Sequence, residues 1–103
     1  MNIFEPIFLI FAHHIGDVAC QPSWLIKNKH EHTFAIYEHS VVWTAVVSFM
    51  LLALGILELW KILFLLIGHF VIDWFKYKRL PDNYNYIYID QLLHYAQIMI
   101  CLI

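Results

Sequence analysis

Three pairs of ionisable residues in this sequence each combine a histidine with an aspartate four positions away. The pairs are His13 with Asp17, His69 with Asp73, and Asp90 with His94. On a helix, such a pair lies on one face, with about 6 Å between the two residues along the axis. Imidazole nitrogens and carboxylate oxygens are ligands that suit zinc, manganese and iron. The pairs therefore predict a metal site, provided that the segments carrying them are helices that pack together.

The segments that carry the pairs are strongly apolar. The 103 residues are 62% hydrophobic and only 14% charged, whereas soluble domains carry roughly 25% charged residues. Polar loops separate four apolar segments, and we expect helices at about residues 6–25, 34–57, 62–77 and 86–103. None of these has a strongly polar face for water. The sequence predicts an all-α fold with one domain over residues 1–103, a polytopic membrane protein built as a four-helix transmembrane bundle.

Basic residues predict the orientation of this bundle. If the four helices are antiparallel, five basic residues share one side: Lys27, Lys29, Lys76, Lys78 and Arg79. Only Lys61 lies on the other side. Since cytoplasmic loops are enriched in Lys and Arg, we expect a multi-pass protein of the bacterial inner membrane with both termini on the non-cytoplasmic side.

Charge and helix length also bear on partners. The formal net charge of -2 argues against a nucleic-acid-binding surface, which needs a clear excess of cations. Membrane lipids are the partners that we expect. The third and fourth helices are short for a full span, so local thinning of the bilayer, tilt or a homo-oligomer would have to accommodate them.

The predicted orientation places the polar residues at one depth. His39, near the start of the second helix, joins the three pairs, and all seven residues fall roughly 6–20 Å from the cytoplasmic ends of their helices at 1.5 Å per residue. A charged aspartate in the membrane costs about 2.5–3.5 kcal/mol and usually marks a functional site. A divalent cation would remove that cost and the repulsion among the aspartates. The candidate metal ligands are His13, Asp17, His39, His69, Asp73, Asp90 and His94.

Seven candidates exceed the three or four ligands of one catalytic zinc. They suit a two-metal site, with ions about 3.5–4 Å apart. Zinc is the divalent metal that we expect, with manganese and iron as alternatives and with one or two ions bound. A metal-free polar or proton-relay network is the competing interpretation. Transport across the membrane is disfavoured, because the second and fourth helices are almost wholly apolar beyond the site, over residues 46–57 and 98–103.

Several neighbouring residues are expected to support the site. Gln21, Gln91 and His14 are candidates for orienting the ligands through hydrogen bonds. Glu38 is an alternative ligand to His39, its neighbour in the sequence. The basic side chains that ring the predicted opening can attract an anionic group, although the orientation rule alone also accounts for them. These side chains are Lys27, Lys29, Lys76, Lys78 and Arg79.

The motifs also resemble a known family. AHHIGDVACQ at 12–21, the lone His39, HFVIDWFK at 69–76 and DQLLH at 90–94 are similar to the bacterial and phage membrane proteins grouped as domain of unknown function 3307. The likeness covers nearly the whole chain in the same order. Similar His/Asp patterns occur in proteins described as membrane-bound metal-dependent hydrolases. Val18 stands where an aromatic residue is expected and His14 where an apolar one is, and neither is a predicted ligand.

The sequence therefore predicts a membrane-embedded metal-dependent hydrolase, with a phosphoester or lipid headgroup as the expected substrate class. A metal pair would activate a water and polarise the ester. Asp17, Asp73 and Asp90 are the catalytic candidates, as ligands or with one of them as general base. The alternative is a non-enzymatic membrane protein, either a metal-binding or structural module or a phage accessory factor. Metal content per chain, measured together with hydrolysis, distinguishes the two.

Overall fold

The computed structural model describes residues 3–19, 33–78 and 84–103. In these ranges the chain forms four α-helices and one short π-helix, with no strand. The elements are α1 (Phe4–His14), η1 (Ile15–Ala19), α3 (Thr33–Ala53), α4 (Leu59–Lys78) and α5 (Tyr84–Ile100). The predicted all-α class is confirmed. The part of the first predicted helix beyond residue 19 lies outside the described residues.

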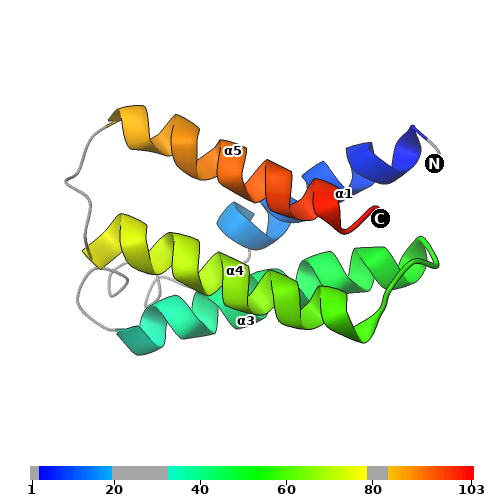
Figure 1. The fold of residues 1–103 in the computed structure, drawn as a ribbon, viewed down its shortest axis with the longest axis horizontal. Coiled ribbons are helices and arrows are strands. Elements are labelled where there is room, and N and C mark those ends of the chain that lie inside the picture. Colours follow the sequence, from blue (N-terminus) through cyan, green and yellow to red (C-terminus); the bar gives the residue numbers. More distant parts are fainter. Residues whose placement is uncertain (1–2, 20–32, 79–83) are drawn as a thin grey trace.

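The helices run alternately in opposite directions and enclose one interior (Figure 1). Each packs against two others: α1 contacts α3 and α5, and α4 contacts the same two. Both chain ends lie at one end of the bundle, next to the α3–α4 connection (Figure 1). The end of α4 and the beginnings of α3 and α5 gather at the opposite end, and η1 ends part-way along the bundle (Figure 1).

The connection between α3 and α4 is set by Gly55. Its φ of +77° is a left-handed conformation that glycine adopts without a steric penalty. The Ile56 N–H donates to the Leu51 carbonyl at 3.0 Å and the Gly55 N–H to the Leu52 carbonyl at 3.0 Å, which is a Schellman ending. The helix therefore ends at Ala53, before the expected residue 57, and α4 begins at Leu59, before the expected residue 62.

An apolar core fills the end of the bundle where the chain ends lie. Its buried members include Leu9, Val47, Leu51, Leu65 and Ile98. Burying such side chains stabilises the fold by about 1.5–3 kcal/mol each. Since α1, α3, α4 and α5 all contribute, this core fixes the helices relative to one another and so positions the polar residues beyond it.

Many polar side chains are buried, and many large apolar side chains are exposed. Ten polar or charged side chains are buried among the described residues, as many as the buried apolar ones. Meanwhile, large apolar side chains such as Phe49, Ile67 and Leu92 are each more than 60% exposed. Soluble proteins rarely bury charged groups or expose broad apolar patches. This distribution is inverted relative to a water-soluble domain.

Helix length supports one membrane span. Among the described residues, only α3 is both long and apolar enough to cross a membrane, judged by length and composition. The first α-helix has 11 residues before η1 and α5 has 17, while the 20 residues of α4 include Lys61, Asp73, Lys76 and Lys78. The four-helix transmembrane bundle therefore stays a prediction.

Gly16 allows η1 to approach α3 closely. A Cβ atom built there would lie 3.2 Å from the Cα and 3.1 Å from the Cδ1 of Trp43. We expect Gly16→Val to destabilise the protein by about 1–3 kcal/mol, the usual cost of overpacking. Thermal unfolding in detergent measures this loss. Ala45→Val, at an exposed position of α3, is the matched control and should leave the unfolding temperature unchanged. Equal stability of both variants would contradict the close packing.

Candidate metal centre

Six of the seven predicted ligands meet in two groups that share one residue. Asp17, His39, His69 and Asp73 form the four-residue group, and Asp73, Asp90 and His94 form the three-residue group. In each group the candidate ligand atoms all lie within 4.8 Å of one another. The residues come from η1, α3, α4 and α5. Both groups have the composition and spacing to hold a metal ion.

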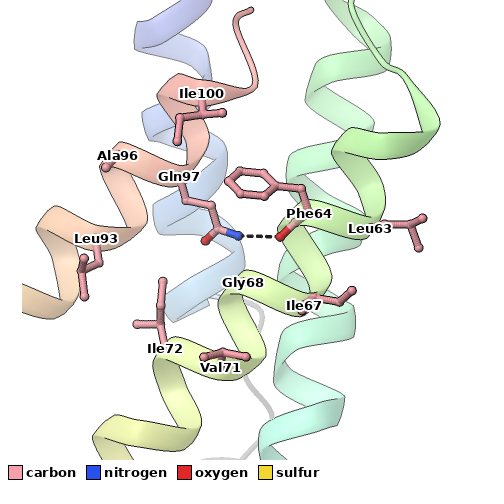
Figure 2. Close-up of a pocket in the computed structure, with 10 residues that line it drawn as sticks. All are labelled: Leu63, Phe64, Ile67, Gly68, Val71, Ile72, Leu93, Ala96, Gln97 and Ile100. Atoms are coloured by element: carbon pink, nitrogen blue, oxygen red, sulfur yellow. Dashed lines mark hydrogen bonds between the residues drawn. The ribbon is translucent and has the colours of Figure 1, made fainter.

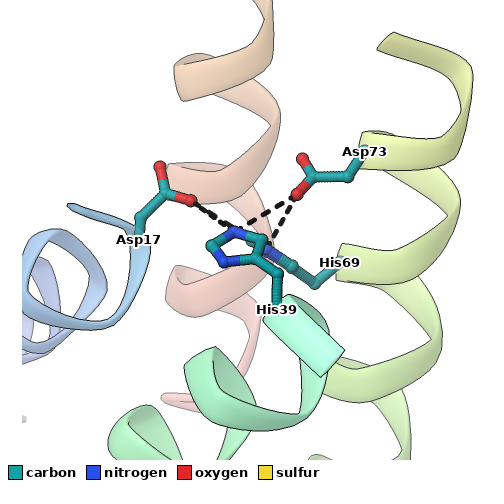
Figure 3. A group of neighbouring side chains, drawn as sticks. All are labelled: Asp17, His39, His69 and Asp73. Atoms are coloured by element: carbon teal, nitrogen blue, oxygen red, sulfur yellow. Dashed lines mark hydrogen bonds and ion pairs between the residues drawn. The ribbon is translucent and has the colours of Figure 1, made fainter. Parts of the chain in front are cut away.

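The four-residue group has the spacing that a small ion requires (Figure 3). His39 Nε2 lies 3.0 Å from Asp17 Oδ1 and 3.4 Å from Asp73 Oδ2. His69 Nε2 lies 3.2 Å from Asp73 Oδ2 and 4.0 Å from Asp17 Oδ1. Four atoms at about 2.0–2.1 Å from a central tetrahedral ion are about 3.3 Å apart. The observed spacing is close to that value.

Asp73 belongs to both groups through different oxygens. Its Oδ2 lies near His39 and His69, while its Oδ1 lies 3.7 Å from His94 Nε2. The Nδ1–H of His94 is directed at the backbone carbonyl of Asp90, at 2.8 Å, which leaves Nε2 to face Asp73. The carboxylate of Asp73 thus faces both groups. Its side chain is only 3% exposed.

Several of these buried atoms have no hydrogen-bond partner among the described residues. They are His69 Nδ1 and Nε2, His39 Nδ1, His94 Nε2 and Asp90 Oδ1. The His69 and His94 Nε2 atoms lie near carboxylate oxygens without hydrogen-bond geometry. An unpaired buried polar atom costs about 1–3 kcal/mol, and metal coordination satisfies a ring nitrogen without a proton. The donor set therefore fits a divalent cation.

His13 is in neither group, because hydrogen bonds occupy both of its ring nitrogens. The Trp43 indole can only donate, and it donates to His13 Nδ1 at 3.0 Å. The proton of His13 therefore resides on Nε2, which donates to Gln91 Oε1 at 2.9 Å. The structure gives His13 the contacts of a residue that orients Gln91, instead of those of a ligand.

Gln91, held in place by His13, in turn orients two carboxylates. With its oxygen facing His13, its amide nitrogen donates to Asp17 Oδ2 at 3.3 Å and to Asp90 Oδ2 at 3.3 Å. Each carboxylate thus keeps Oδ1 toward its own group. Such contacts to ligands typically contribute 10–100-fold to metal affinity.

Trp43 is a site residue that the sequence analysis did not single out. Besides its bond to His13, its ring stacks on His69, with centroids 4.1 Å apart and an angle of 15° between planes. It is fully buried. Its position four residues after His39 on α3 places it on the same helix face, which is the signal that could have identified it.

The other predicted residues lie around the groups or outside the described part. His14 is exposed and hydrogen-bonds Tyr95 at 2.7 Å, so it contacts α5 beside His13. Glu38 is in neither group. Lys76 Nζ donates to Asp90 Oδ2 at 3.3 Å, which puts one predicted anion-attracting residue at the site. Gln21, Lys27, Lys29 and Arg79 lie outside the described residues, as does the side chain of Lys78.

Residues 6–103 match the family described as protein of unknown function (DUF3307). The chain belongs to this family. The resemblance inferred from the His/Asp motifs is confirmed as membership of this family of unknown function. Neither a search of curated proteins nor one of solved structures found a match.

Gln91→Ala tests the proposed orientation of the ligands. It removes the contacts to Asp17 and Asp90 without removing a ligand, so we expect metal affinity to fall roughly 10–100-fold. Competition with a chromophoric chelator measures the affinity. Gln97→Ala, on the same helix but hydrogen-bonded to backbone carbonyls of α4, should keep the wild-type affinity. A similar loss in both variants would contradict a specific role for Gln91.

Proposed function

We propose that this protein is a membrane-embedded metal-dependent hydrolase of phosphoesters, with a dinuclear centre near the cytoplasmic face. The observation that carries the proposal is the placement of Asp73, whose two oxygens face two separate sets of ligands. A carboxylate bridging two ions is typical of two-metal hydrolytic sites, where the ions clamp the attacking and leaving oxygens. A closed structural zinc site needs four ligands, whereas six residues converge here.

Zinc is the ion that we propose for both positions. Mixed imidazole and carboxylate ligands suit zinc, and also manganese and iron. The ligand atoms of the four-residue group are separated by distances close to those around a tetrahedrally coordinated ion. The three-residue group has fewer protein ligands, as catalytic zinc sites do when they keep a position for water or substrate.

Side chains of this protein would orient the reacting groups and balance the charge at the reaction site. When bound, the ions would supply an activated water and polarise the ester oxygen. Lys76, whose side chain is 28% exposed, lies beside Asp90 and would attract the anionic group of the substrate. Asp17, Asp73 and Asp90 are the catalytic candidates, and Gln91 holds two of them in orientation. The aromatic face of Trp43 closes the site from the apolar core.

The membrane part of the proposal is supported by the inverted distribution of polarity. Exposed apolar side chains occur on every helix, for example Phe11 on α1, Phe49 on α3, Ile67 on α4 and Leu92 on α5. Lipid can cover this outside, while the buried polar groups pair inside. We propose several spans in the bacterial inner membrane, with the metal groups and the basic residues of the same end toward the cytoplasm.

The alternative is a non-enzymatic membrane protein that binds metal for structure or serves as a phage accessory factor. The observation that favours it is the burial of the two metal groups, in which His39, His69 and His94 are at most 1% exposed. Substrate access then requires an opening between helices, whereas a structural ion does not.

Asp73→Asn separates these functions. Elemental analysis of the wild-type protein should give two ions per chain, and the variant should hold at most one and lose hydrolysis of a generic phosphodiester by a factor of at least about 1,000, the effect of roughly 4 kcal/mol at the transition state. Glu38→Gln, next to His39, is the matched control and should keep both ions and activity. One tightly bound ion in the wild type without turnover would favour the structural alternative.

Membrane insertion is tested independently of metal. The protein expressed in a bacterial host should stay in the membrane fraction after alkaline carbonate extraction. A reporter active only outside the cytoplasm should be active when fused to either terminus, because α1 begins and α5 ends at the end of the bundle opposite the beginning of α3 and the end of α4 (Figure 1). Release by carbonate, or activity of the reporter at only one terminus, would contradict the proposed topology.

A further inference from the structure

A long apolar groove runs along the outside of α4 and α5 (Figure 2). Its main part has a volume of about 570 Å³, within the usual size range of ligand sites. It is open to the outside, as the exposure of Leu63, Ile67 and Leu93 shows. Its walls are almost entirely apolar. Gly68 and Ala96 are the two smallest lining residues, and the Gln97 amide occupies the space beside Gly68.

This groove continues to the metal groups. A second pocket of about 200 Å³ shares Val71, Ile72 and Leu93 with it and adds Lys76 and Asp90. Asp90 is also a member of the three-residue group. From Leu63 to Lys76 the path along α4 covers about 20 Å at 1.5 Å per residue. The groove is therefore apolar for most of its length and charged where it meets the site.

One polar group stands in the apolar part. The amide nitrogen of Gln97 donates to the carbonyls of Phe64 and Leu65, at 3.0 and 3.1 Å. Its oxygen Oε1 is buried without a partner in the part of the chain that the structure describes and points away from the Phe64 carbonyl (Figure 2). A residue whose only role was to pack against lipid would not keep an unpaired carbonyl, because this costs about 1–3 kcal/mol.

A groove on another face lacks the charged end. Between α3 and α4, a pocket of about 260 Å³ is lined by apolar residues with Thr44 and Ser48, and no charged side chain is among them. The two grooves thus share an apolar, lipid-facing character. They differ in the cation of Lys76 and in contact with the metal groups.

From this combination we infer that the α4–α5 groove holds the alkyl chain of an anionic, phosphate-headed amphiphile whose headgroup lies at Lys76 and Asp90. The inference rests on the proposed function and specifies its substrate as a lipid phosphoester that enters sideways between α4 and α5. Lys76, which also pairs with Asp90 at 3.3 Å, supplies the cation for the head, and the apolar walls contact the chain. Such a route explains how a substrate reaches histidines that are closed to solvent.

The experiment measures binding without turnover. The protein is placed in phosphatidylcholine nanodiscs with a trace of hexadecyl phosphate that carries a terminal diazirine, and photolabelled residues are located by mass spectrometry. Hexadecanol with the same diazirine is the uncharged probe. We expect labels from the phosphate probe to concentrate on the groove end formed by Leu63 and Ile100, and the alcohol to label apolar faces of all helices.

Three variants sharpen the test. Ala96→Trp fills the groove and should reduce phosphate-probe labelling roughly tenfold, the effect of about 1.4 kcal/mol of lost binding. Ala45→Trp, in the α3–α4 groove, is the matched control and should leave labelling unchanged. Lys76→Gln should reduce labelling by the phosphate probe and leave labelling by the alcohol as it was. A cooperative thermal unfolding transition close to that of the wild type shows that each variant is folded.

The outcomes distinguish a failure of the inferred lipid groove from a failure of the proposed hydrolase function. Even labelling of all helices by the phosphate probe, or labelling that Ala96→Trp does not reduce, overturns the groove, and this holds whether or not the protein cleaves soluble phosphoesters. Localised labelling in a protein that binds no metal and cleaves nothing overturns the proposed function and leaves the groove as a lipid site. Localised labelling that Lys76→Gln does not reduce overturns the assignment of the headgroup.

Discussion

The arrangement of this protein depends on how it keeps the carboxylate of Asp73 inside an apolar bundle. A buried carboxylate is costly unless cations or hydrogen-bond donors compensate it. Three histidines face its two oxygens, from α3, α4 and α5. These histidines can compensate the carboxylate as ligands of a shared cation, and because they come from three different helices, the helices could not then move apart without leaving its charge unpaired. The same requirement that stabilises Asp73 therefore assembles the candidate centre.

The surrounding elements are shaped to serve this arrangement. Gly16 brings η1 against Trp43, and this proximity lets Asp17 reach His39 at 3.0 Å. A π-helix is a rare element that is often found at functional sites, and here it carries Asp17 itself. On the other side of the bundle, Gly68 leaves room for the Gln97 amide, which would lie 2.3 Å from a Cβ at that position. Glycines thus set the distances between helices directly beside two of the ligands.

The sequence predicts much of this site because helical periodicity is a local property. The spacing of His69 with Asp73 and of Asp90 with His94 suffices to place each pair on one face, and the four apolar segments suffice to bring the faces together. His13 shows what helical spacing cannot predict. The π-helix changes the register between His13 and Asp17, and the Trp43 indole, from another helix, occupies the His13 ring. Neither effect can be read from spacing along one helix, and the helix end at Ala53 depended on the backbone angle of Gly55.

Because Trp43 stacks on His69, its fluorescence can report on the state of the candidate metal centre. Indole emission responds to the electronic state of an imidazole held 4.1 Å away in a nearly parallel plane. The chain has four tryptophans, so replacing the other three with phenylalanine would isolate one emitter beside the centre. Binding of an ion at His69 would then be detectable without a label and without any knowledge of the substrate.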